Sequence, residues 1–202
     1  MNRSELVNRN ISTVVNNLIE GAVIVFLVLI LFLGNLRAGL IVASVIPLAM
    51  LFAFIMMRVF NVTANLMSLG AIDFGIVVDG SIVILEGILA HIYGKQFRGR
   101  TLTRKEMDKE VEKGASGVAR SATFAVLIIL IVFFPILTLN GIEGKYFTPM
   151  AKTLVFCIIG ALILSLTYVP MMASLFLKHT IVVKPTLADR FFEKLNKIYQ
   201  HT

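Results

Sequence analysis

The fold is decided by an apolar stretch that holds three acids, Leu69-Gly-Ala-Ile-Asp73-Phe-Gly-Ile-Val-Val-Asp79-Gly-Ser-Ile-Val-Ile-Leu-Glu86. Carboxylates inside a helix of membrane length are energetically costly, and chains that keep them commonly use them to move ions or protons. The three acids, Asp73, Asp79 and Glu86, are therefore the candidate functional residues of the chain.

Composition places the whole chain in a membrane, because 57% of its residues are hydrophobic and only 15% are charged. The net charge of +7 comes from basic residues in short loops beside apolar segments, where membrane orientation signals lie, so nucleic-acid binding is not expected. The sequence contains no glycine-rich phosphate-binding loop, and ATP is not expected to supply energy within this chain. We expect an all-α integral membrane protein without a cofactor.

The hydropathy pattern divides the chain into three parts. Residues 14–178 are predicted to form a transmembrane domain of five helices, between a periplasmic connector at 1–13 and a cytoplasmic amphipathic segment at 179–202. The five spans are expected at about residues 14–33, 38–60, 63–93, 116–139 and 149–177. Between the last three spans, we expect a short surface helix at 104–113 that Gly114 ends, and a small loop at 140–146.

Lysine and arginine concentrate in the loop between the third and fourth spans and in the tail after Leu177. Two spans separate these segments, so both lie on one side of the membrane, and that side also receives Arg37. Because short basic loops stay in the cytoplasm, we expect a cytoplasmic C-terminus and a periplasmic N-terminal segment. An exported N-terminal segment without a signal peptide suggests that the chain is part of a longer protein.

Helical geometry decides which acids can cooperate. Asp79 and Glu86 are seven residues apart, which places them within about 20° of each other and roughly 10 Å apart along the axis. Asp73 is rotated by about 120° from Asp79, onto a neighbouring face. Gly75 continues the Asp79 face, and Gly70 and Gly80 flank it. These small residues are predicted to let another helix approach closely, so that the acids point into a bundle rather than into lipid.

Burial favours a neutral carboxyl and a nearby cation favours a carboxylate, so a buried acid between these influences can load and release a proton. The spans contain no convincing cation to pair with the acids, since Lys152 lies at the edge of an apolar segment. The cationic partner is therefore expected from sequence outside this chain. The alternative is that the acids only hydrogen-bond helices together in a structural or assembly protein, or in a split or degenerate pump.

The segment from Asp73 to Glu86 resembles the fourth transmembrane helix of heavy-metal resistance-nodulation-division efflux pumps. Leu31-Phe-Leu-Gly-Asn-Leu-Arg37, Val45-Ile-Pro47-Leu and Asn65-Leu-Met-Ser-Leu-Gly70 are similar to other segments of the same family. The resemblance implies transmembrane helices two to six of a twelve-helix transporter. One position departs from the family, which usually has an asparagine where this chain has Gly87.

The resemblance implies a proton-driven antiporter that exports heavy-metal cations, with Asp73, Asp79 and Glu86 as its proton relay. It further implies a homotrimer in the inner membrane of a Gram-negative bacterium, working with a periplasmic adaptor and an outer-membrane channel. The metal path of such pumps lies mainly in periplasmic domains, so no metal site is expected in this chain. The Gly75-Ile-Val-Val segment lacks the methionine of copper(I) and silver(I) pumps, which favours zinc, cobalt, nickel or cadmium as cargo.

Two other interpretations of the metal-like and acidic residues carry less weight. Methionines such as Met50, Met57 and Met172 could form a soft-metal ladder, but methionine more often fills irregular apolar gaps. An intramembrane aspartyl protease needs two facing carboxyls, whereas Asp73 and Asp79 lie on one helix and point about 120° apart. The chain is therefore not expected to be an enzyme.

Overall fold

The computed structural model describes residues 19–31, 35–62, 74–94 and 102–177, together with Ser12 and Asn16. Regular structure in this part of the chain is helical throughout. It comprises a short apolar helix at Ile19–Leu31 and four longer helices, α2 (Leu36–Val59), α4 (Phe74–Ile92), α5 (Arg104–Leu137) and α6 (Gly141–Phe176). Each of the four longer helices is long and apolar enough to cross a membrane. The predicted all-α membrane fold is confirmed.

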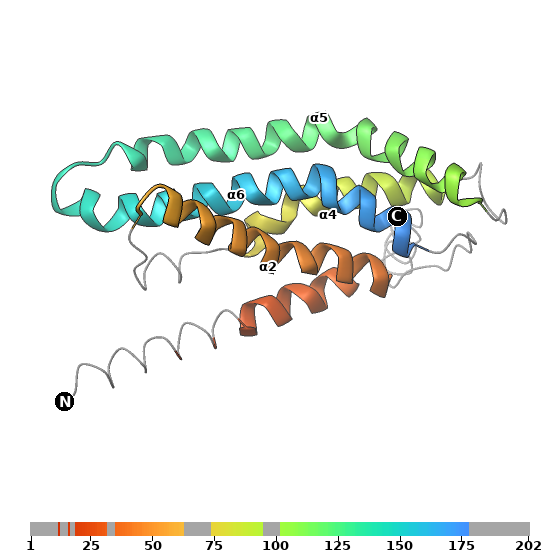
Figure 1. The fold of residues 1–202 in the computed structure, drawn as a ribbon, viewed down its shortest axis with the longest axis horizontal. Helices are drawn as coiled ribbons and strands as arrows, with labels where there is room; N and C mark the ends of the chain where they lie inside the picture. The colour runs from red at the N-terminus through yellow and green to blue at the C-terminus, as the bar shows by residue number, and fades with distance from the viewer. Residues whose placement is uncertain are drawn as a thin grey trace, which may run out of the picture.

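Helices α4 and α6 form the centre of the bundle. They contact each other, and each also packs against both α2 and α5, which flank the central pair. Figure 1 shows the four helices lying along the long axis of the molecule, with the turn between α5 and α6 at the end away from the last residues of α6. The core is aliphatic, with Val42 and Val45 of α2 and Ile84 and Ile88 of α4 almost completely buried.

The outside of the bundle is also apolar, as expected for helices in lipid. On α5, for example, Phe124, Ile128 and Ile131 are each at least 60% exposed. Prolines lie inside the helices, with Pro47 in α2 and Pro135 in α5. A proline removes one backbone donor but leaves the helix intact where neighbouring groups compensate.

Helix α5 corrects the prediction that Gly114 ends a separate surface helix. One continuous helix runs from Arg104 to Leu137. The Thr103 backbone N–H donates to Glu106 Oε2 at 2.9 Å, which stabilises the first turn. A glycine ends a helix where the chain needs a left-handed residue, but Gly114 is present because α4 approaches it closely, as described below. The charged segment is therefore the projecting end of a membrane helix about 51 Å long.

Helix α6 corrects a second boundary. Residues 141–146 were expected in a loop, with the helix starting at Pro149, yet α6 begins at Gly141, directly after Asn140. Gly141 has a φ of 78° and makes the turn from α5. Glu143 lies in the first turn, where a carboxylate interacts favourably with the helix dipole. Pro149 is accommodated inside the helix, and its carbonyl accepts a hydrogen bond from the Thr153 hydroxyl at 2.8 Å.

Other predicted boundaries are described only in part. Of the first predicted span, the structure describes a continuous stretch at residues 19–31, and of the third it describes residues 74–93. The predicted periplasmic connector at 1–13, apart from Ser12, and the amphipathic segment at 179–202 lie outside the described residues. Their assignments remain predictions.

One end of the bundle collects the polar contacts between helices. Arg37, at the start of α2, donates to the carbonyl of Phe176 at 3.0 Å. The Ser174 hydroxyl of α6 donates to the Asp108 carboxylate of α5. These contacts place the starts of α2 and α5 and the end of α6 together, as the predicted alternation of spans requires.

Candidate functional site

The candidate site is on α4, whose surroundings differ from face to face. Most of the helix is covered by the neighbouring helices of the chain, and Ile84 and Ile88 are fully buried. Asp79, Val83 and Glu86 form an exposed stripe along the remaining face. The two acids thus lie on one face of α4, about 10 Å apart along its axis. We call Asp79, Val83 and Glu86 the acidic stripe.

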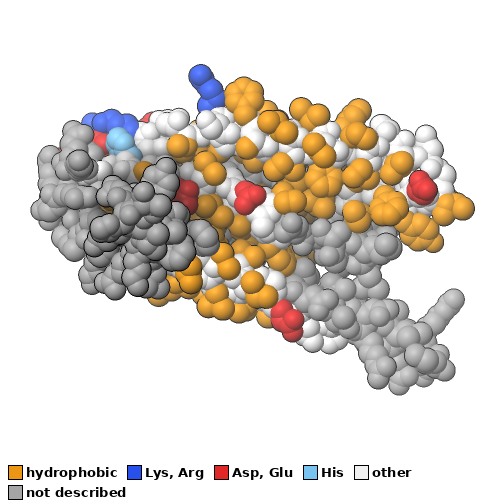
Figure 2. Space-filling model, turned by 180° about the vertical axis from the view of Figure 1, so that it is seen from behind, with side chains coloured by type: hydrophobic (Ala, Val, Ile, Leu, Met, Phe, Trp, Pro, Cys, Tyr) orange, Lys and Arg blue, Asp and Glu red, His pale blue; other side chains and the backbone are white. Residues whose placement is uncertain are grey.

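The acidic stripe lies in an apolar setting. Helix α4 is long and apolar enough to cross a membrane, and Asp79 and Glu86 are the only Asp, Glu, Lys or Arg residues in it. The back of the molecule, seen in Figure 2, shows single acidic side chains among hydrophobic ones. Carboxylates exposed to lipid are strongly disfavoured. A protein surface from outside the described residues is therefore needed to cover this stripe.

The other predicted members of the site are placed only in part. Asp73 and Gly70 lie outside the described residues, so their roles remain predictions. Gly75 is half-buried. Gly80 is buried on the side of α4 that faces α5 and α6, where an added Cβ would lie 3.5 Å from both the Ser165 hydroxyl and a Val126 methyl. Gly80 thus contributes to packing within the chain, and close packing at the acidic stripe itself remains a prediction.

Two further glycines, which the sequence analysis did not assign to the site, fix α4 against α5. A Cβ on Gly87 would lie 2.5 Å from a Val118 methyl, and one on Gly114 would lie 2.8 Å from the Ile88 Cα. Real Cβ atoms essentially never approach heavy atoms this closely. Gly87 and Gly114 therefore form a close crossing of the two helices. This close crossing explains why the chain has glycine at position 87, where the efflux pumps that it resembles usually have asparagine.

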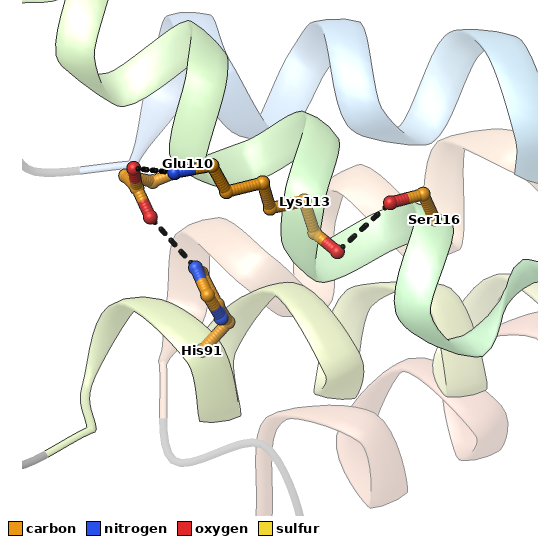
Figure 3. A network of polar contacts seen from close by, with 4 residues as sticks. All are labelled: His91, Glu110, Lys113 and Ser116. Atoms are coloured by element: carbon orange, nitrogen blue, oxygen red, sulfur yellow. Dashed lines mark hydrogen bonds and ion pairs between the residues drawn. The ribbon is translucent and has the colours of Figure 1, made fainter.

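A polar cluster lies beside this crossing, near the end of α4. His91 Nε2 of α4 is 2.7 Å from Glu110 Oε2 of α5, and Lys113 Nζ is 2.7 Å from Glu110 Oε1. Figure 3 shows both side chains directed toward the Glu110 carboxylate. Hydrogen bonds from Lys113 and His91 hold the pKa of Glu110 below its ordinary value.

His91 and Glu110 were not among the residues that the sequence predicted for the site. The partner Glu110 is 19 positions along the chain. Only the continuous α5, which folds back across α4 at Gly114, brings the carboxylate to the imidazole. The i,i+3 spacing of Glu110 and Lys113 was visible in the sequence, whereas the contact with His91 depends on the crossing.

The described residues contain no group of three or more His, Cys, Asp and Glu side chains that could hold a metal ion. Met57 is 4% exposed, and Met50 and Met172 pack against the hydrophobic core. The Thr153 hydroxyl lies 3.5 Å from the Met57 sulfur. These three methionines have the packing role that the sequence predicts.

A family model described as the AcrB/AcrD/AcrF family matches residues 1–202. The chain belongs to this family. The cobalt-zinc-cadmium resistance protein CzcA of Cupriavidus metallidurans is 49% identical over 183 residues, which are 90% of this chain and 17% of that protein. The nickel and cobalt resistance protein CnrA of the same organism is 45% identical over 179 residues, which are 88% of this chain and 17% of that protein.

A crystal structure of a heavy metal efflux pump superposes with a TM-score of 0.74 at 41% sequence identity, covering 87% of this chain and 16% of that one. The resemblance to heavy-metal efflux pumps of the resistance-nodulation-division type is thereby confirmed. The chain spans about a sixth of the length of these relatives.

Proposed function

We propose that this chain supplies the proton-relay half of the transmembrane domain of a proton-driven heavy-metal efflux pump, with Asp73, Asp79 and Glu86 as the relay. The observation that carries the proposal is the acidic stripe. Two carboxyls share the one exposed face of an otherwise covered membrane helix. Such a face suits acids that exchange protons with a partner surface in the rest of a longer protein.

The chemistry of the relay is a change of protonation driven by a changing environment. A carboxyl enclosed by apolar surface favours its neutral form, and a cation brought close to it favours the carboxylate. In the proposed pump the second half of the membrane domain covers the acidic stripe and supplies the cation. Movement of that half relative to α4 then loads protons from one side and releases them to the other.

The remaining parts of the proposal follow from the relatives. CzcA is a cobalt-zinc-cadmium resistance protein, and CnrA is a nickel and cobalt resistance protein. We propose divalent cations of this group as the cargo of the complete protein. The complete protein is proposed to be an inner-membrane homotrimer with a periplasmic adaptor and an outer-membrane channel. Its polar helix end, with Arg37 and Asp108, is proposed to face the cytoplasm.

The test is the substitution Asp79→Asn in the complete pump. Asparagine keeps the size and the hydrogen-bonding capacity of the side chain but cannot release a proton. We expect proton-driven export of zinc or cobalt from cells to fall to the level of cells without the pump, while the amount and the oligomeric state of the purified protein stay unchanged. The matched control is Glu143→Gln, which neutralises an exposed acid in the first turn of α6.

Two outcomes separate the alternatives. Unchanged proton-coupled export by the Asp79→Asn pump contradicts the relay. Loss of assembly in Asp79→Asn, with normal assembly in Glu143→Gln, favours the structural role in which the acids only hold helices together.

A further inference from the structure

A cavity lies at the end of the bundle where α5 turns into α6 (Figure 1), opposite the end at which Arg37 and Asp108 make their contacts. The end of α2, the turn between α5 and α6, and the start of α6 form its walls. Its volume is about 490 Å³. Neither the proposed relay nor the contact of His91 with Glu110 uses this cavity.

The charges around the cavity all have one sign. Among the lining residues that the structure describes, Lys145 and Lys152 are charged, and Asn61, Asn140 and Thr148 are polar but neutral. No Asp or Glu belongs to this described lining. Within the described part of the chain, neither lysine forms an ion pair or a side-chain hydrogen bond. The cavity therefore has an uncompensated positive charge and favours an anionic partner.

The spacing of the two lysines indicates what kind of anion fits. Lys145 and Lys152 are seven residues apart on α6, so they share one face and lie roughly 10 Å apart along the helix axis. A single phosphate is only a few ångströms across and pairs with both ammonium groups only if the side chains bend toward each other. Two carboxylates seven residues apart on a partner helix have the same spacing as the lysines. The geometry thus matches an acidic protein segment better than one small anion.

The cavity also lies where a protein segment outside the membrane can reach it. The 25 residues of α6 and its end from 153 to 177 contain no charged side chain. They are about 37 Å long as a helix, which is enough to cross a hydrocarbon layer of about 30 Å. The start of α6, with Lys145 and Lys152, therefore projects from the hydrocarbon layer into the interface and the water beyond it.

We propose that this cavity is an interface for an acidic segment from the part of the complete pump that lies outside this sequence. One carboxylate of that segment pairs with Lys145 and a second, roughly 10 Å away, pairs with Lys152. The chain spans about a sixth of the length of its relatives, so most of the complete protein is available as the partner. The inference rests on the proposed pump. It ties the part of that pump outside the membrane to α6, which packs directly against α4.

The test is cross-linking of the complete, purified pump with a water-soluble carbodiimide. This reagent joins a lysine amine to a carboxylate as an amide, with loss of one water, only where the two groups are already in contact. We expect mass spectrometry of the peptides to find Lys145 and Lys152 joined to Asp or Glu residues outside residues 1–202. The internal control is Lys113 with Glu110, whose Nζ and Oε1 atoms are 2.7 Å apart.

Two results of the cross-linking overturn the proposal. In the first, Lys113 and Glu110 are linked but Lys145 and Lys152 are not. In the second, the two lysines are linked only to acids of this sequence. If an excess of inorganic phosphate, or phospholipid retained by the purified pump, protects the unlinked lysines from acetylation, the cavity binds a phosphate group instead of a protein segment.

Variants test whether the charge holds the segment. In the double variant Lys145→Gln with Lys152→Gln, we expect hydrogen exchange of the cross-linked segment to become about tenfold faster, the effect of losing two exposed ion pairs. Arginine at both positions keeps the charge and should keep the exchange slow. The matched control is Lys105→Gln with Lys109→Gln, two exposed lysines at the other end of the bundle. Unchanged exchange in the first variant, or equal acceleration in the control, overturns the proposal.

The interface and the relay can fail independently. Missing cross-links in a pump whose metal export is lost in Asp79→Asn overturn the interface alone. Cross-links at Lys145 and Lys152 in a pump that keeps full export in Asp79→Asn support the interface and contradict the relay alone.

Discussion

One flank of α4 meets α5 through Gly87 and Gly114, whereas another face of the same helix exposes Asp79, Val83 and Glu86. On the flank, backbones approach so closely that a single added carbon has no room. On the exposed face, two acids stand on an apolar surface. The same helix thus combines a tightly packed flank with a face that exposes its acids.

This difference teaches how a membrane helix can hold acids in place and still let their surroundings change. The glycine crossing and the His91 to Glu110 contact tie α4 to α5, so we expect the two helices to move together. A partner that shifts over Asp79 and Glu86 then changes the environment of the acids while their own position stays fixed. Substitutions on the two sides of α4 should therefore have different effects.

The largest effect is expected at the crossing, with Gly114→Ala. The new Cβ meets the α4 backbone at Ile88, which cannot move aside like a flexible side chain. We expect the complete pump to lose about 1–3 kcal/mol of stability, the usual cost of overpacking, and with it much of its folded yield. Thermal unfolding of the purified protein in detergent measures the loss of stability, and size-exclusion chromatography measures the folded yield.

The matched control is Gly117→Ala, three residues further along the same helix. Its Cβ enters open space, so only the higher helix propensity of alanine remains, and stability should stay equal or rise by up to about 1 kcal/mol. Both substitutions gain the same propensity, and their difference therefore isolates the clash. Equal stability of the two variants contradicts a close crossing at Gly114.

Much of the fold was predictable from the sequence because membrane helices have a strong signal. The apolar segments predicted α2, α4, α5 and α6. The errors in the predicted helix boundaries lie at glycines and at the charged ends of helices. Gly114 was read as a helix end because a glycine that ends a helix and a glycine that admits a neighbouring helix look alike in sequence. Only the packing of α4 distinguishes the two.

A smaller effect is expected on the exposed face, with Glu86→Gln. The side chain is exposed, so the substitution should leave stability within about 0.5 kcal/mol of the parent. Proton-driven metal export should fall about tenfold, which corresponds to roughly 1.4 kcal/mol of barrier. Uptake of radioactive zinc or cobalt into inside-out vesicles with an imposed proton gradient provides the measurement.

Glu86→Asp serves as the companion variant because it keeps a titratable carboxyl on the same face. It should retain more export than Glu86→Gln. Equal export by the two variants, or a loss of stability in Glu86→Gln comparable to that of Gly114→Ala, removes the distinction between the two sides of α4.

The candidate site was less predictable than the fold. Spacing alone placed Asp79 and Glu86 on one face, since both belong to one helix. The contact of His91 with Glu110 was missed because it joins two helices whose crossing the sequence does not reveal. The relative positions of residues within one helix follow from helical geometry. A contact between residues of two helices can be predicted only when the register in which the helices pack is known.

The smallest effect is expected at this contact, with Glu110→Gln. The carboxylate is 14% exposed and pairs with His91 and Lys113, which lowers its pKa from an ordinary value of 4.5. A lowered folded-state pKa means that the stabilisation is present above pH 4.5 and disappears as the pH falls through the lower value. We expect Glu110→Gln to cost about 0.5–1 kcal/mol at pH 7 and almost nothing under more acidic conditions. Thermal unfolding of the complete pump at pH 7 and at a pH below the lowered pKa of Glu110 measures the difference. The control is Glu112→Gln, at an exposed position two residues further along α5. A cost of Glu110→Gln that is equal at both pH values shows that the contact between α4 and α5 does not depend on the charge of this carboxylate.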